Sequence, residues 1–139
     1  MNFNKADEIY QKALQVEPEN PNALAFSALN KIHTKDLEKA KEQIELALKT
    51  GKDQSFLLFI AGKICYLLKQ FEDAKMYLIK SYEGDPTNDC QNLLGLCYFE
   101  LGNYGQANGI FANLLEKTPM NINLILSSAK CYEKMDDVK

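Results

Sequence analysis

Few residues in this chain of 139 residues have the types and spacing that chemistry requires. Histidine occurs once, at His33, so the sequence offers no histidine pair to bind a metal ion. A cysteine nucleophile needs a neighbouring base, and Cys65, the cysteine nearest in sequence, is far from His33. The glycine-rich segment 102–109 has neither the G-x-G-x-x-G spacing nor the Gly-Lys-Ser/Thr ending of phosphate-binding loops. We therefore predict that the chain is not an enzyme and binds no metal ion or cofactor.

Small residues at a fixed spacing show how the chain is organised. One series of alanines recurs every 33 or 34 residues, each with an apolar or aromatic residue three places before it and a bulky apolar residue four places after it. A second series of small residues repeats with nearly the same period. The first series is Ala6, Ala40, Ala74 and Ala107, and the second is Ala28, Gly62, Gly95 and Ala129. Such a period indicates one supersecondary unit stacked several times, with small residues where paired helices approach closely.

The spacing of apolar residues within each period is helical, in steps of three and four. Prolines recur at one point of the period, at Pro18, Pro86 and Pro119, where a helix must end. Asn20-Pro21 indicates a helix N-cap followed by proline at the first helical position, and Gly51 offers a left-handed cap. The sequence therefore predicts an all-α fold of about eight helices, each of about 13–16 residues.

Composition and charge narrow the class of partner. The net charge of −3 is too small to indicate one, and a nucleic-acid partner would require a basic stripe. No apolar run approaches the roughly 20 residues that span a membrane.

The cysteines show no close pairing, and equivalent positions on stacked helices about 8–10 Å apart are too distant for an easy disulfide. The four thiols, of Cys65, Cys90, Cys97 and Cys131, are therefore predicted to be reduced and mostly buried, as in a cytoplasmic protein.

The repeated residues resemble the tetratricopeptide repeat (TPR) pattern W-x2-L-G-x2-Y…A-x3-F…P. The best copy lacks only the opening aromatic residue and contains Gln91, Leu94, Gly95, Tyr98, Ala107, Phe111 and Pro119. Earlier copies have Cys65 or Lys31 where tyrosine is usual. The resemblance covers the whole chain and implies a right-handed solenoid of antiparallel helix pairs.

The register of the repeats predicts a single TPR array over residues 1–139. Residues 1–20 form the second helix of a partial repeat, 21–54, 55–87 and 88–121 form complete repeats, and 122–139 form the first helix of another partial repeat. The array is expected to be a segment of a longer protein. Apolar residues at its two ends should lack helix partners and could stack copies head to tail. These residues are Ile9 and Tyr10 at one end and Ile125, Ala129 and Tyr132 at the other.

In TPR proteins the first helices of successive repeats line a concave groove. The resemblance places sixteen positions of this chain there: Asn22, Ala25, Leu29, Ile32, Phe56, Phe59, Lys63, Tyr66, Asp89, Asn92, Leu96, Phe99, Asn123, Leu126, Lys130 and Glu133. Family members that bind the acidic tails of heat-shock chaperones hold them with lysine, asparagine and arginine in this groove. Here Ala25 and Leu29 occupy two of those positions and the sequence has no arginine, so that partner is not expected.

The resemblance implies a non-catalytic scaffold or adaptor segment that binds a peptide or an amphipathic helix in an apolar groove. Two other functions stay open: homotypic assembly through the apolar ends, and a regulatory TPR segment of a larger enzyme. The groove side chains could be open to a ligand, or they could mostly be buried between neighbouring first helices.

Overall fold

The computed structural model describes residues 2–51 and 54–137. Those residues form eight helices and no strand, so the predicted all-α fold is confirmed. The helices are α1 (Phe3–Val16), α2 (Pro21–His33), α3 (Leu37–Leu48), α4 (Gln54–Leu67), α5 (Phe71–Gly84), α6 (Asn88–Glu100), α7 (Tyr104–Lys117) and α8 (Ile122–Asp137). α3, with 12 residues, is shorter than predicted. The predicted segments 1–20, 21–54 and 122–139 include positions 1, 52–53 and 138–139, which lie outside the described residues.

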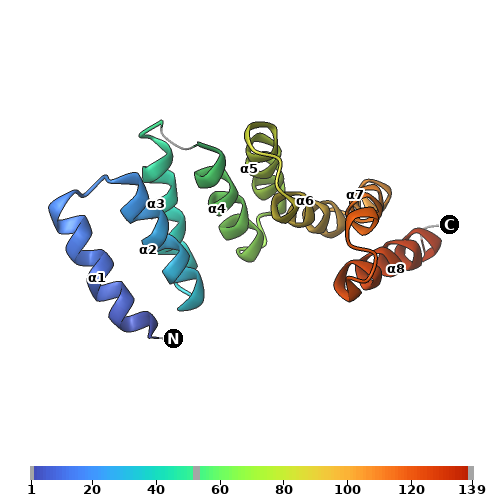
Figure 1. The fold of residues 1–139 in the computed structure, drawn as a ribbon, viewed down its shortest axis with the longest axis horizontal. Coiled ribbons are helices and arrows are strands. Elements are labelled where there is room, and N and C mark those ends of the chain that lie inside the picture. The colour runs from blue at the N-terminus through green and yellow to red at the C-terminus, as the bar shows by residue number, and fades with distance from the viewer. Residues whose placement is uncertain (1, 52–53, 138–139) are drawn as a thin grey trace.

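The helices form an elongated row in chain order, and the two termini lie at opposite ends of that row (Figure 1). Each helix packs mainly against its neighbours in sequence, with smaller contacts between α2 and α4 and between α4 and α6. The direction of the helix axes changes along the row. In Figure 1, α1 is seen from the side, whereas α7 is seen nearly end-on. This arrangement is quasi-one-dimensional.

The turns and helix ends follow the local sequence. The side-chain oxygen of Asn20 accepts a hydrogen bond from the Ala23 N–H at 2.9 Å, and Pro21 is the first residue of α2, as predicted. Gly51 has a positive φ of 76°, as expected of a left-handed cap. The turn inside each complete repeat also contains a residue with positive φ: Lys35, Lys69 or Gly102. The two lysines were not predicted there, because left-handed backbone favours glycine.

Small residues on the first helices lie against bulky residues on the second helices. A Cβ atom built on Gly62 would lie 2.6 Å from Leu78 Cγ, and one built on Gly95 would lie 2.8 Å from Phe111 Cε1. The core accordingly divides into three clusters along the row. The first includes Ala28 and Ile44, the second includes Leu78 and Cys97, and the third includes Phe111 and Cys131. The predicted close approach of paired helices is confirmed at both glycines.

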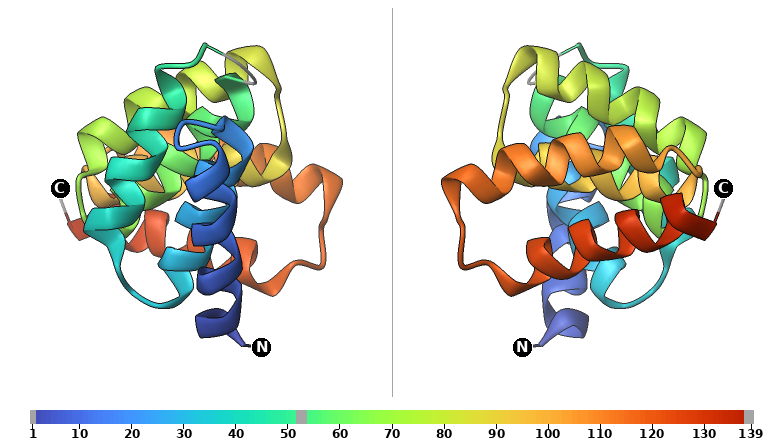
Figure 2. Two further views of the ribbon diagram at one scale, coloured as in Figure 1. Left: turned by 90° about the vertical axis from the view of Figure 1, so that its left-hand side faces the viewer. Right: turned by 90° about the vertical axis from the view of Figure 1, so that its right-hand side faces the viewer.

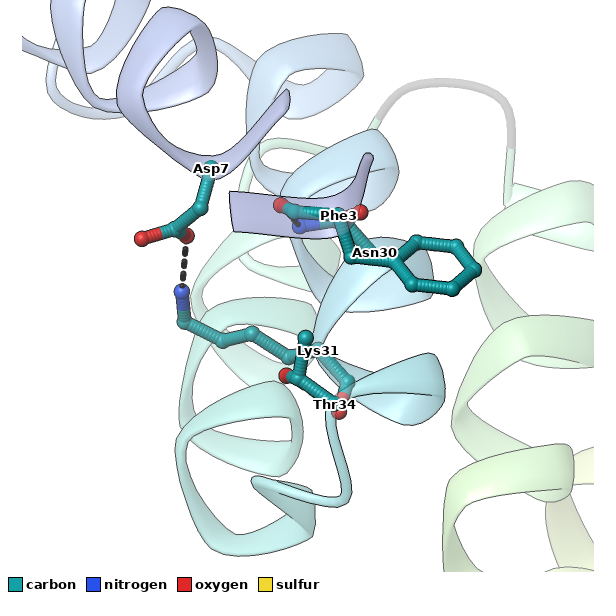
Figure 3. Close-up of polar contacts among 5 residues, drawn as sticks. All are labelled: Phe3, Asp7, Asn30, Lys31 and Thr34. Atoms are coloured by element: carbon teal, nitrogen blue, oxygen red, sulfur yellow. Dashed lines mark hydrogen bonds and ion pairs between the residues drawn. The ribbon is translucent and has the colours of Figure 1, made fainter. Parts of the chain in front are cut away.

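Polar contacts join α1 to α2 (Figure 3). The Lys31 ammonium donates to the Asp7 carboxylate at 2.8 Å, and the side-chain amide of Asn30 donates to the Phe3 carbonyl at 3.0 Å. His33 also stacks on the Phe3 ring, with the centroids 4.7 Å apart. Lys31 is buried, with 7% of its surface exposed, so its charge depends on Asp7 for compensation. α1 is thereby fixed in place on α2.

Candidate peptide-binding groove

The first helices α2, α4, α6 and α8 carry the predicted groove residues. Seven of the sixteen are exposed: Asn22, Phe56, Asp89, Asn123, Leu126, Lys130 and Glu133. Eight more are partly buried: Leu29, Ile32, Phe59, Lys63, Tyr66, Asn92, Leu96 and Phe99. Ala25, by contrast, is fully buried and has no surface for a ligand. Half of the sixteen predicted groove side chains are thus partly buried, exposing part of their surface and packing with the rest.

Two aromatic groove residues are held by rings on the following helix. Tyr66 meets Phe71 edge-on with centroids 5.5 Å apart, and Phe99 meets Tyr104 in the same way at 5.2 Å. Phe71 and Tyr104 each open a second helix, so these contacts clamp the turn between the paired helices. Such aromatic pairs contribute roughly 0.5–1.5 kcal/mol beyond their buried area. Tyr66 and Phe99 are therefore structural residues as well as candidate ligand contacts.

The most open aromatic surface of the groove lies between α2 and α4. Phe26 and Phe56 have 46% and 43% of their surfaces exposed, and their ring centroids are 6.2 Å apart. We call them the aromatic pair. Phe26 also lines a shallow pocket of about 230 Å³ with Phe3, Tyr10 and Leu29. The sequence reasoning missed Phe26, although its position four residues after Asn22 and three before Leu29 places it on the same helical face.

The C-terminal part of the groove carries several amide side chains. A pocket of about 520 Å³, here called the amide pocket, is lined by Asn88, Asp89, Asn92, Leu96, Leu114, Thr118, Asn121, Asn123, Leu124 and Ser127. Asn121 caps α8 by accepting from the Leu124 N–H at 3.2 Å, and Asn88 accepts from the Lys117 ammonium at 3.3 Å. Within residues 2–51 and 54–137, the amides of Asn92 and Asn123 have no hydrogen-bond partner. Amide and apolar side chains therefore lie together at this end of the groove, where Leu126 is also 53% exposed.

The groove carries no dominant charge. Lys63 and Lys130 supply positive charge, while Asp89 and Glu133 supply negative charge at other groove positions. Neither lysine forms an ion pair within the described part of the chain. Charge alone therefore indicates no class of ligand for this groove.

The residues predicted to be bare at the ends lie on α1 and α8, far apart in the row (Figure 1). Ile9 is 54% exposed on α1, whereas Tyr10 is partly buried against α2. On α8, Ile125 is 45% exposed and Tyr132 is 58% exposed, and Ala129 is exposed too. One molecule therefore cannot bring the two sets together.

The cysteines of the described residues lie in the packed core. All four cysteines are buried and unpaired, as predicted. Burial raises the pKa of Cys65 to about 11 and that of Cys97 to about 12, so neither thiol forms a thiolate at neutral pH. Among the described residues, no cluster of three or more histidine, cysteine or acidic residues could hold a metal ion. No described helix has the length and apolarity needed to cross a membrane.

Comparison with curated proteins found distant relatives. No protein-family model matches the chain. It is 27% identical over 134 residues to BBSome complex member BBS4 of Bos taurus, covering 95% of this chain and 25% of that protein. It is 26% identical over 137 residues to the TPR repeat-containing protein MJ1428 of Methanocaldococcus jannaschii, covering 98% of this chain and 24% of that protein. The chain thus spans about a quarter of the length of these relatives.

Solved structures resemble the chain along nearly its whole length. MamA superimposes with a TM-score of 0.84 at 20% identity, covering 96% of this chain and 74% of MamA. YrrB, a TPR protein with an unusual peptide-binding site, superimposes with a TM-score of 0.83 at 21% identity, covering 96% and 70%. A tetratricopeptide repeat protein from Parabacteroides merdae gives a TM-score of 0.82 at 21% identity, covering 96% and 53%. At these identities the likeness shows the fold.

Proposed function

Because the chain has the fold of a tetratricopeptide repeat solenoid, we propose that it is a non-catalytic protein-interaction module that binds a partner's peptide or amphipathic helix in its concave groove. The aromatic pair is the observation that carries this proposal. Folding normally buries large aromatic side chains, yet Phe26 and Phe56 are each more than two-fifths exposed, side by side on successive first helices. Aromatic residues near the centre of an interface commonly supply most of its binding energy.

The two parts of the groove suit different parts of one ligand. The aromatic pair and the adjoining pocket would accept an apolar anchor side chain. The unpartnered amides of Asn92 and Asn123 can each donate to a peptide carbonyl and accept from a peptide N–H. A segment with an apolar anchor at one end and accessible backbone at the other therefore fits best. The likeness to YrrB, itself a peptide-binding TPR protein, supports a ligand of this class.

Selection from a random-peptide library displayed on phage tests the proposal without a known partner. Selected peptides are synthesised, and their affinity for the purified chain is measured by titration calorimetry. The Phe26→Ser and Phe56→Ser substitutions should each weaken binding about tenfold or more, as expected of interface hot spots. Met76→Ser is the matched control, because Met76 is 54% exposed but lies on the second helix α5.

The outcomes separate clearly. Loss of binding in the two phenylalanine variants with normal binding in the control supports the groove. Equal binding by all three variants, or a library that yields no binder, would contradict it. Circular dichroism spectra of each variant establish that the helices are intact. All three positions are exposed, so the substitutions should not disturb folding.

A second candidate function is self-association, favoured by the exposed apolar face of α8. A third candidate function is a regulatory role within a larger enzyme. No described residue favours this role over peptide binding in the groove. We also expect a reducing compartment such as the cytoplasm, because all four thiols are unpaired and belong to the packed core.

A further inference from the structure

We propose that the polar contacts between successive repeats specify which second helix stacks on which first helix, and that the Asp7–Lys31 ion pair is the most selective of them. The device is conformational, because it favours one order of stacking over others that the repeated apolar pattern would also allow. It goes beyond ligand binding in the groove and does not depend on it.

The repeated packing pattern creates the need for such a device. Ala40, Ala74 and Ala107 lie at equivalent positions of α3, α5 and α7, and all three are fully buried. Because residues of the same size recur at these positions, apolar packing alone distinguishes one repeat from another poorly. A second helix could therefore stack on the first helix of the wrong repeat, either within a chain or between two copies that fold together.

The polar contacts that join successive repeats all come from one position, the residue directly after each alanine of the first series. This residue reaches across to the repeat that follows it in the chain. The contacts are Asp7–Lys31 at 2.8 Å, Lys41–Gln70 at 2.6 Å, Lys75 over the Tyr98 ring at 5.9 Å from its centroid, and Asn108–Ser128 at 2.7 Å. Figure 2 shows the row from its two ends, with α1 in front in the left view and α8 in front in the right view, so the helices that these contacts join lie stacked one behind another.

The surroundings of this position differ from one junction to the next. Lys31, Cys65 and Tyr98 are equivalent residues of α2, α4 and α6. Burial raises the pKa of Cys65, and the Lys41 ammonium opposes part of that rise, as expected of a positive charge close to the thiol. Successive junctions therefore place a carboxylate against an ammonium, an ammonium near a thiol, and an ammonium over an aromatic ring.

Wrong stacking on α2 would be penalised by charge. Among the four equivalent residues of the first helices, Lys31 alone is charged, and it is only 7% exposed, so its ammonium requires a negative partner. Among the four residues that follow the alanines, Asp7 alone is acidic. If α3 or α5 stacked on α2, Lys41 or Lys75 would face Lys31, and two ammonium groups would be buried together.

Wrong stacking of α1 would be penalised as well. On α4 or α6, the Asp7 carboxylate would face the thiol of Cys65 or the ring of Tyr98 in place of an ammonium. Burying a carboxylate without a positive partner is costly. Asp7 and Lys31 therefore select each other, whereas the apolar residues around them would accept several arrangements.

Exchanging the two charges separates selectivity from stability. In the double variant Asp7→Lys/Lys31→Asp the ion pair is kept, but the residues after the first three alanines are then all lysines. The carboxylate on α2 could pair with Lys41 or Lys75 equally well, so the pair remains and its selectivity is lost. A second double variant, Asp7→Leu/Lys31→Met, removes both charges and should be about as stable as the unmodified chain, since apolar residues often replace a buried ion pair without loss.

Refolding at high protein concentration tests the proposal. Each chain is unfolded in urea, refolded by removal of the urea and then diluted. Copies that have exchanged helices stay associated after dilution, whereas contacts between folded surfaces dissociate. Size-exclusion chromatography then measures the persistent fraction of dimers and larger species, which should be at least about threefold greater for both double variants than for the unmodified chain.

Matched controls make the same replacements away from the junctions. Lys80 and Glu83 are exposed on α5, so Lys80→Asp/Glu83→Lys and Lys80→Met/Glu83→Leu should leave the persistent fraction unchanged. Gly62→Ala supplies a third reference, because overpacking against Leu78 should lower stability without altering any charge at a junction. Urea unfolding midpoints of all the variants allow their persistent fractions to be compared at known stability.

Two results would overturn the proposal. The first is a persistent fraction in both double variants no greater than that of the unmodified chain, or no greater than Gly62→Ala gives for the same loss of stability. The second is an equal rise in the controls on α5, which would assign the effect to surface composition. A rise in the double variants alone, beyond what lost stability explains, would support selection of the stacking order by the junction contacts.

Discussion

Gly62 lies so close to Leu78 that a Cβ atom at position 62 would come within 2.6 Å of the Leu78 Cγ atom. Gly95 and Phe111 repeat this relationship in the next pair of helices, at 2.8 Å. In each case the glycine has no cap or turn to form, since it lies inside a helix. Because glycine has no side chain, it leaves room for the second helix to approach closely.

Gly62→Ala should lower the free energy of unfolding by about 1–2 kcal/mol, because overpacking costs about 1–3 kcal/mol and the gain in helix propensity is at most about 1 kcal/mol. Gly109→Ala is the matched control. Gly109 also lies inside a helix, but its Cβ would meet no atom within 4 Å, so this variant should gain about 0.5–1 kcal/mol. Urea unfolding followed by circular dichroism measures both. Stabilisation by both substitutions would show that helix propensity, and not close approach, governs these positions.

The Asp7–Lys31 ion pair should stabilise the N-terminal interface. Asp7→Ala leaves a buried ammonium without its partner, and since the carboxylate is 41% exposed we expect a loss of only about 1–2 kcal/mol. Glu8→Ala, which removes an exposed carboxylate one residue later on α1, should change stability by less than about 0.5 kcal/mol. Equal losses of unfolding free energy in the two variants would show that the effect comes from removing any negative charge on α1, and not from the ion pair with Lys31.

The same ion pair predicts a dependence on pH. The hydrogen bond from Lys31 holds the pKa of Asp7 below its ordinary value of 3.8. The carboxylate therefore contributes its full stability above about pH 3.8, and the contribution is lost as the pH falls through the lower, folded-state pKa. The difference in unfolding midpoint between the natural chain and Asp7→Ala should be constant near neutral pH and shrink in acid. If the two unfolding midpoints still differed by the same amount once Asp7 is fully protonated, this assignment would be contradicted.

The turns at Lys35 and Lys69 should be strained. Left-handed backbone costs roughly 1–2 kcal/mol for a residue other than glycine, and the equivalent turn already has Gly102. Lys69→Gly should therefore raise the free energy of unfolding by about 1 kcal/mol. The identical replacement Lys80→Gly, at an exposed position inside α5, should lower it by about 1 kcal/mol. Destabilisation by both replacements would mean that the Lys69 side chain contributes more than its backbone strain removes.

The thiols should be unreactive until the chain unfolds. With their pKa raised by burial to about 11 and about 12, Cys65 and Cys97 should resist alkylation by iodoacetamide at pH 8. Met76→Cys supplies an exposed thiol that should react at the rate of a free cysteine, and mass spectrometry distinguishes the sites. Rapid labelling of all the native cysteines in folded protein would show that the core opens readily.

Alkaline pH should also destabilise the fold. A thiol whose folded-state pKa exceeds its ordinary value of 9.0 contributes its full stability below about pH 9, and that contribution is lost as the pH rises toward the folded-state pKa. The unfolding midpoint should accordingly fall between about pH 9 and 11. Cys65→Ser and Cys97→Ser variants should show a weaker decline over this window than the natural chain.

The sequence supported the fold much more firmly than the site. Helices and their ends follow from local signals such as Asn20-Pro21 and Gly51 and from a period repeated along the chain. Lys35 and Lys69 were missed, because a positive φ at lysine has no sequence signal of its own. The Asp7–Lys31 pair was missed as well, because pairing residues 24 apart requires the angle between α1 and α2. The amide pocket depends in the same way on how α6 and α8 are set relative to one another.

A row of helices that contact mainly their neighbours has mechanical consequences for recognition. Small changes in the angle between successive helix pairs add up along the row, so they would bend or extend the array as a whole. Changes in those angles would alter the distance between the aromatic pair and the amide pocket. A ligand that engages both sites would have to match the distance between them in the free chain or change the angles between helix pairs. Once bound, it would restrict those angles. The length of the ligand, and not its chemistry alone, would then be a determinant of specificity.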